Sequence, residues 1–319
     1  MSNENSTLKF LAKFEHIGVR LDVFLSEYVE DWSRSQLKKL IDNGNVLLND
    51  KAVKSSYKLQ ENDEVTVELI EMGASNFEPE EIPLNIVFED DYLAVINKSA
   101  GMVVHPGAGI SSGTLANAIA WHFKFAIPEN KKSKTANRIG IVHRLDKDTS
   151  GLIVVAKNDL THEKLAAQFH DRKVQKSYVA LVHGYVRKLS GKIDKPIARD
   201  RSNRVKMAVD KNGRNAVSIY KVRQRFENFT LLDVSIRTGR THQIRVHLSH
   251  INHPIVGDET YNGGRDNQIK DALLKKTLKN TNRFFLHAEK LSFTHPVSKE
   301  TMDFSQTLPN ELTNLLKSI

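Results

Sequence analysis

The chain has 319 residues, enough for two domains, and its 39% hydrophobic and 27% charged residues are typical of a globular protein. It contains no cysteine, which excludes disulfides, thiolate zinc sites and cysteine nucleophiles. The N-terminus lacks a signal pattern and no apolar run reaches the roughly 20 residues of a membrane span, so we expect a cytoplasmic protein that does not enter membranes.

The formal net charge of +9 is unevenly distributed. Residues 1–81 contain nine Lys/Arg and sixteen Asp/Glu, a balance of −7. Subtracting these from the chain totals of 47 and 38 leaves 38 and 22 for residues 82–319, a balance of +16. Such a basic body suggests a polyanionic partner, nucleic acid first of all, although charge that serves only solubility explains the composition equally well.

Residues 18–70 have the pattern of a small module with two helices and a sheet. Apolar residues at i, i+3, i+4 and i+7 predict the first helix, namely Leu21, Phe24, Leu25 and Tyr28. The second helix is expected to begin near Ser33, where Ser33-x-x-Gln36 has the form of a capping box. Asn49-Asp50 then predicts a hairpin turn, and the alternation over residues 65–69 predicts a strand.

Three cations are expected on the exposed side of the second helix: Arg34, Lys38 and Lys39. Their spacings of four and five residues bring them close together on a helix. They form either a phosphate-binding face or an ordinary solvated face. Residues 18–58 carry seven basic and six acidic side chains, so the nearly neutral module is not expected to bind strongly by itself.

The remainder divides into an extension, a linker and a larger domain. Residues 1–17 are expected to be an N-terminal extension, and residues 71–81 a linker. In residues 82–319, many short strands and few helices predict an α+β domain built on a mixed, largely antiparallel sheet. Strands are expected at residues 86–88, 93–96, 151–156, 174–182, 218–222, 231–236 and 291–293, with a polar basic loop at 126–138 and helices at 161–170 and near 269–278.

The densest group of reactive side chains is His143-Arg144-Leu145-Asp146-Lys147-Asp148-Thr149-Ser150-Gly151, a charged turn before an apolar strand. Loops on rigid sheets are where catalytic residues concentrate. Arg144 and Lys147 flank Asp146, and nearby cations keep a carboxylate ionised and ready to act as a nucleophile. The alternative is an ordinary salt-bridged turn.

A second group spans residues 237–247 and contains three arginines and two histidines. Gly239 permits a tight turn or a close ligand approach. Ile244 and Val246 would anchor one face while Arg245 points to the other. Arginine makes bidentate bonds to carboxylate and phosphate, so the segment is either a binding element or a generic basic loop.

Several motifs occur in one order: HRLDKDTSG at 143–151, KSYVALVHG at 176–184 and RTGRTHQIRVH at 237–247, followed by HPIVGDETYNGG and FFLHAEKLSFTHP. They resemble the pseudouridine synthases of the ribosomal large-subunit type over residues 82–306. The segment from Gly18 to Asp50 resembles the S4 RNA-binding domain. The S4-like segment at the front and residues 103–109 are similar to the branch of the family designated D. Taken alone, residues 103–109 are explained equally well as a structural turn.

The resemblance implies roles for individual residues. Asp146 would be the essential carboxylate, Tyr178 would lie against the uracil ring and help in the later proton removal, and Arg245 would pair with Asp146. Arg144 would fill the gap left by the departed base. Further RNA-binding residues are expected to be Lys176, Arg240, His242, Arg34, Lys38 and Lys39.

The reaction of this family moves the C1′ bond of uridine from N1 to C5, exchanges no electrons or groups, and therefore implies no cofactor and no metal. Asp146 could attack C1′, add to C6 or assist loss of the 2′ proton, and the sequence does not choose. His247, His250 and His253 lack the carboxylates or thiols of a metal site, so core or RNA-contact roles are favoured.

The branch modifies several uridines in the large-subunit stem-loop that contacts the small subunit. The implied partner is ribosomal RNA or the assembling large subunit, bound by a monomer. Two alternatives remain: the same chemistry on other ribosomal or transfer RNA uridines, and a non-catalytic RNA-binding protein, which would not require Asp146.

Overall fold

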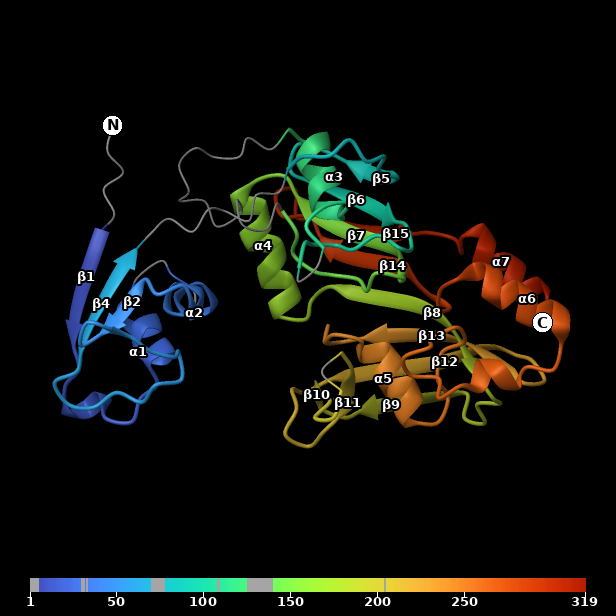
Figure 1. Ribbon diagram of the computed structural model, residues 1–319. Helices are drawn as coiled ribbons and strands as arrows, with labels where there is room; N and C mark the ends of the chain where they lie inside the picture. Colours follow the sequence, from blue (N-terminus) through green and yellow to red (C-terminus); the bar gives the residue numbers. More distant parts are fainter. Residues whose placement is uncertain are drawn as a thin grey trace. The chain divides into compact units, whose positions relative to one another are not determined.

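The computed structural model describes residues 6–29, 32, 34–69, 78–107, 110–124, 140–203 and 205–319. The chain divides into two compact units, Met1–Ala74 and Ser75–Ile319, and each is described by itself (Figure 1). None of the described helices combines the length and apolarity that crossing a membrane requires. The polar loop expected at residues 126–138 and most of the expected linker lie outside the described residues.

The N-terminal unit is a four-stranded antiparallel sheet, in the order β1-β4-β2-β3, with two helices. Its elements are β1 (Ser6–Leu11), α1 (Leu21–Tyr28), α2 (Arg34–Asp42), β2 (Val46–Leu48), β3 (Lys51–Ala52) and β4 (Glu64–Leu69). The predicted hairpin turn is confirmed, because Asn49 and Asp50 have φ of 48° and 63°, the left-handed pair that joins twisted strands. Ser33, the expected start of α2, lies outside the described residues.

The residues expected as an N-terminal extension contribute a strand to this sheet. Strand β1 pairs with β4 from Ser6↔Leu69 to Leu11↔Glu64. Leu8 and Phe10 pack against the core of the unit, while Thr7 and Lys9 are exposed. This alternation is short, but it has the period of a half-buried strand.

The C-terminal unit is built on a nine-stranded sheet with the order β5-β6-β7-β14-β8-β13-β12-β9, and β15 pairs with β14. Its strands are β5 (Ile86–Glu89), β6 (Leu93–Lys98), β7 (Ser150–Ala156), β8 (Gln175–His183), β9 (Ser190–Asp194), β12 (Val217–Arg225), β13 (Phe229–Ile236), β14 (Leu286–Thr294) and β15 (Thr301–Ser305). Only β7 and β14 run parallel among these pairs. The α+β class with a mixed, largely antiparallel sheet is therefore confirmed.

Helices cover both faces of this sheet. The described ones are α3 (Leu115–His122), α4 (Asp159–His170), α5 (Gln243–His250), α6 (Ala272–Thr281) and α7 (Asn310–Lys317). Ile153 and Val155 of β7 face the core that contains α3, α5, α6 and α7, whereas Leu152 and Val154 face the core that contains α4. Strand β7 is thus buried on both sides, and its N-terminal end is a rigid support for the turn before it.

Strands β7 and β14 approach one another closely at Gly151. This glycine has φ of +111°, and a Cβ atom there would lie 2.3 Å from the carbonyl oxygen of Ala288. Only glycine fits such an approach.

The expectation for residues 244–246 was wrong in its geometry. They belong to α5, where Ile244 packs into the large core and Val246 packs into a separate cluster with Ile197 and Ala216, so these two residues do not share one face. Three alternating residues are too few to separate strand from helix periodicity. A two-stranded ribbon of β10 (Ile197–Arg199) and β11 (Met207–Val209) lies beside α5 (Figure 1).

Candidate active site

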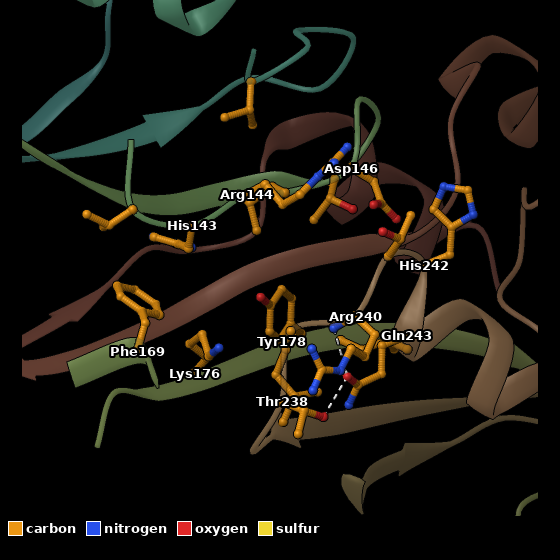
Figure 2. A pocket seen from close by; sticks show the side chains of 18 of the residues that line it. His143, Arg144, Asp146, Phe169, Lys176, Tyr178, Thr238, Arg240, His242 and Gln243 are labelled. Atoms are coloured by element: carbon orange, nitrogen blue, oxygen red, sulfur yellow. Dashed lines mark hydrogen bonds between the residues drawn. The ribbon is translucent and has the colours of Figure 1, made fainter. Parts of the chain in front are cut away.

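A cavity of about 1020 Å³ is lined by residues of the three motifs that begin at His143, Lys176 and Arg237 (Figure 2). Its walls come from the turn before β7, the end of α4, the start of β8 and the segment from Ile236 to Arg245. Among its lining residues the acidic ones comprise Asp146 alone, and the Lys/Arg side chains are Arg144, Arg172, Lys176, Arg237, Arg240 and Arg245. This excess of cations around one carboxylate favours an anionic ligand.

Asp146 lies on a turn that the backbone fixes from both sides. The amide of Thr149 donates to the Asp146 carbonyl at 3.1 Å, and the amide of Gly101 donates to the Lys147 carbonyl at 3.0 Å. Leu145, 5% exposed, anchors the turn in the core. The side chain of Asp146 is 17% exposed, so the carboxylate faces the cavity from a fixed support.

Lys98 fixes the same turn through a hydrogen bond to the Lys147 carbonyl. Its side chain is 1% exposed, and its ammonium donates to the carbonyls of Ser99, Met102 and Lys147 at 2.7, 2.9 and 3.0 Å. Burial, reinforced by Arg283, lowers the pKa of Lys98 to about 7, against the opposite influence of Asp148 and Asp146. All three hydrogen bonds of this ammonium are made within the chain, which indicates a structural role.

Arg245 contacts two carboxylates, and the stronger contact is one that the sequence reasoning missed. Its Nε and Nη2 donate to the two oxygens of Asp258 at 2.7 and 2.9 Å, a bidentate pair in which Asp258 is 1% exposed. Its Nη1 reaches Asp146 Oδ2 at 3.4 Å. The guanidinium also lies over the rings of Phe284 and Tyr261, at 4.4 and 4.9 Å from their centroids. Asp258 therefore fixes Arg245, and Arg245 presents one remaining nitrogen to Asp146.

Tyr178 forms the apolar wall between the two ends of the cavity (Figure 2). It is 6% exposed on β8, opposite Val234 of β13. Burial, and next the charge of Asp146, raise the pKa of its phenol far above the ordinary value. The phenol consequently stays protonated at neutral pH.

His242 begins α5 in a left-handed conformation, with φ of 55°. Its Nδ1 lies 2.8 Å from the hydroxyl of Tyr261, which also accepts the amide N–H of Met207 at 2.8 Å. Burial lowers the pKa of His242, although Asp146 acts in the opposite direction. Tyr261 thus connects the strand β11 to the residue that starts the helix of Arg245.

The other end of the cavity contains Lys176, Phe169 and His143 (Figure 2). The Lys176 ammonium lies 5.3 Å from the centroid of the Phe169 ring, and His143 stacks on that ring at 4.5 Å. His143 Nε2 accepts the amide of Val154 at 3.1 Å, and burial together with Lys176 lowers the pKa of this histidine to about 3. Burial also lowers the pKa of Lys176 to about 8.

Of the remaining expected RNA-binding residues, two line the cavity and three belong to the N-terminal unit. Arg144 is exposed on the turn, and Arg240 is half-buried, with its Nε donating to the Asn215 carbonyl at 3.2 Å. Arg34, Lys38 and Lys39 belong to α2 of the N-terminal unit, where Lys38 is exposed and the other two side chains lie outside the described part of the structure.

No group of three His, Asp or Glu side chains that could hold a metal ion occurs among the described residues. His247 uses both ring nitrogens within the fold, bonding Ser218 Oγ at 2.9 Å and the Lys195 carbonyl at 3.0 Å. Asp258 and Tyr261 had a sequence signal, because both lie in the motif HPIVGDETYNGG. The motif alone assigned them no partner.

Comparisons with known proteins agree with this geometry. A family model described as RNA pseudouridylate synthase matches residues 92–250, and an S4 domain model matches residues 19–65. The chain is 42% identical over 318 residues to ribosomal large subunit pseudouridine synthase D of Pasteurella multocida, covering 98% of this chain and 95% of that protein. It is 40% identical over 308 residues to an uncharacterized RNA pseudouridine synthase of Bacillus subtilis, covering 97% and 96%.

Among solved structures, human RNA pseudouridylate synthase domain containing 4 superimposes with a TM-score of 0.56 at 25% identity, covering 73% of this chain and 92% of that one. The order of motifs, the sheet and the full-length relatives lead to the same assignment. The chain therefore belongs to the RNA pseudouridine synthases, isomerases that act on RNA, and it carries an S4 domain before the synthase domain.

Proposed function

We propose that this protein converts specific uridines of large-subunit ribosomal RNA to pseudouridine, in the stem-loop that faces the small subunit, with Asp146 as the catalytic carboxylate. The observation that carries the proposal is the single carboxylate in a cavity lined by six Lys/Arg side chains. The ribosomal target is supported by the name of the Pasteurella relative and by the order of the S4 and synthase domains. We place this activity in the cytoplasm, at sites of large-subunit assembly.

In the proposed mechanism, Asp146 works as an anion held at the edge of the cavity. The Arg245 nitrogen at 3.4 Å balances its charge without enclosing it in a bidentate pair, since Asp258 already occupies the rest of that guanidinium. Asp146 is therefore free to act at C1′, at C6 or on the 2′ proton. The isomerisation then breaks the N1–C1′ bond and forms the C5–C1′ bond, after which C5 loses its proton and N1 gains one from solvent.

Tyr178 lines the cavity from β8, and we assign it to contact with the uracil ring and to help in the later proton removal. Burial and the charge of Asp146 raise the pKa of its phenol in the free protein. Arg144 is exposed two residues before Asp146, and we assign it to entering the stack as the uridine leaves it. Extruding a base costs a few kcal/mol, and a side chain that fills the gap offsets part of that cost.

Replacing Asp146 with Asn tests the proposal. We expect turnover, measured as tritium release from C5-labelled uridine in a large-subunit RNA fragment, to fall by more than about a thousandfold. RNA affinity and thermal stability should change little. Asp148→Asn, a substitution on the same turn but outside the cavity lining, is the matched control and should retain activity.

Substantial turnover by Asp146→Asn would remove this carboxylate from the mechanism. The target is tested separately, by mapping pseudouridines in total RNA with and without the gene. Modification confined to transfer RNA would overturn the ribosomal assignment while leaving the role of Asp146 intact.

A further inference from the structure

We propose that Lys176 binds one backbone phosphate of the RNA, next to the target uridine, at the end of the cavity opposite Asp146. The proposal rests on the proposed function in one respect, namely that RNA enters this cavity. It assigns a ligand to a side chain for which the described residues supply no hydrogen-bond partner.

Lys176 is half-buried and differs from Lys98, the buried lysine near this site. Lys98 has three carbonyl acceptors within 3.0 Å, whereas Lys176 has no hydrogen-bond acceptor and no carboxylate within bonding distance among the described residues. Its ammonium instead lies over the Phe169 ring, and His143 stacks on that ring. A cation–π contact offsets only part of the cost of withdrawing an ammonium from water.

The other charged groups at this end of the cavity cannot neutralise Lys176. Apart from Lys176 and Asp146, the titratable side chains that line the cavity are arginines, histidines and Tyr178, so Asp146 is the one acidic residue of the described lining. The lowered pKa of Lys176 has burial as its cause, with no opposing anion. An ammonium that is held in place, partly desolvated and without a counterion in the described part of the chain is a site for an anionic group of the ligand.

The position of Lys176 identifies which anion it meets. Lys176 precedes Tyr178 by two residues on β8, so both side chains leave the same face of the strand about 7 Å apart along its axis. If the target uracil lies against Tyr178, the nearest anions in the RNA are the phosphates that flank this nucleotide. A compact ammonium contacts such a phosphate as a point charge.

The test measures binding of the full-length protein to a stem-loop RNA, so that it does not depend on turnover. We expect Lys176→Met to weaken binding about tenfold or more, as for a hydrogen bond to a charged group. The slope of log Kd against log salt should decrease by about 0.7 to 0.9, the value for one phosphate. Lys176→Arg should keep most of the affinity. Lys173→Met removes a nearby exposed lysine, 69% exposed beside Asp171, and should change neither quantity.

A second measurement identifies the phosphate. A set of stem-loops, each with one methylphosphonate near the target uridine, removes the phosphate charges singly. One position should weaken binding to the wild type as much as Lys176→Met does, and should have no further effect on Lys176→Met. Equal additional loss at every position, or an unchanged salt slope for Lys176→Met, would show that Lys176 binds no phosphate.

Competition with inorganic phosphate distinguishes a site for the RNA backbone from a general anion site. Free phosphate at millimolar concentration should leave the Lys176-dependent part of binding unchanged, and full competition would overturn the assignment to RNA. All of these measurements concern RNA binding, whereas the Asp146→Asn test measures turnover. A methylphosphonate series without a Lys176-dependent position and an active Asp146→Asn variant are therefore separate outcomes. The first contradicts this inference and the second contradicts the proposed mechanism.

Discussion

Removing the charge of Asp258 should damage this enzyme in a way that removing the charge of Asp146 does not. Asp258 is 1% exposed and makes both short bonds to Arg245, at 2.7 and 2.9 Å. Asp258→Asn leaves a buried guanidinium without its main counterion, and breaking such a pair costs about 3–5 kcal/mol. Asp146, 17% exposed, makes one 3.4 Å contact, so Asp146→Asn should cost less than about 1 kcal/mol.

The two substitutions should also affect activity for different reasons. Asp146→Asn removes the proposed reacting group. In Asp258→Asn, Arg245 has Asp146 as its only carboxylate within reach in the described structure, and we expect it to move toward that partner. A displacement of about 1 Å at a reacting group can reduce turnover roughly a hundredfold.

Urea unfolding and tritium release measure the two effects on the same preparations. The free energy of unfolding falls by about 2 kcal/mol per molar urea. The lower limit of the expected loss of unfolding free energy for Asp258→Asn therefore lowers the urea midpoint by more than about 1 M. Asp266→Asn is the matched control, because Asp266 bonds His183 at 2.7 Å and does not contact Arg245, so its folded fraction should remain active. Equal midpoints for Asp258→Asn and Asp146→Asn would refute the division of roles around Arg245.

Three further predictions follow from individual side chains. Tyr261→Phe removes the hydroxyl between Met207 and His242 and should lower the free energy of unfolding, measured with urea, by about 1–3 kcal/mol. The ring stays packed in this variant, so a larger loss would contradict the prediction. Arg144→Ala should lose more activity on a stacked target uridine than on the same uridine in a flexible loop, and equal losses on both RNAs would contradict its proposed place in the stack. RNA affinity should fall between pH 7 and 9, because Lys176, with a pKa of about 8 in the free protein, must be protonated to bind phosphate. Lys176→Arg should lack this decline, and a decline of the same size in that variant would assign the titration to another group.

The fold could be predicted from the sequence where periodicity was long. Strand β7 and helix α4 were both expected, since one has an unbroken apolar run and the other a helical stripe. Helix α3 was not expected, because six successive buried residues from Leu115 to Ala120 leave no polar face to set a period. The alternation in β1 was overlooked because it covers few residues.

Several residues of the candidate site were singled out from the sequence, and the structure places them in one cavity, but their contacts could not be predicted. Asp146 and Arg245 lie 99 positions apart in sequence, and their 3.4 Å contact agrees with the pairing that the family resemblance implied. The bidentate partner Asp258 could not be inferred, since its choice depends on how the segment after α5 folds back over that helix. Sequence patterns identify side chains that need a partner, whereas only the tertiary structure shows which carboxylate is in reach.

The close approach of β7 and β14 makes the candidate site sensitive to substitution at Gly151, although this residue carries no reactive group. Because the two strands run parallel, the segments that precede them reach the same edge of the sheet, one with Asp146 and the other with Phe284, which packs on Arg245. A methyl group at Gly151 would meet the Ala288 carbonyl at 2.3 Å and push these segments apart. Directed evolution confined to the cavity lining would therefore overlook a position that sets the spacing of the proposed catalytic carboxylate and its cation.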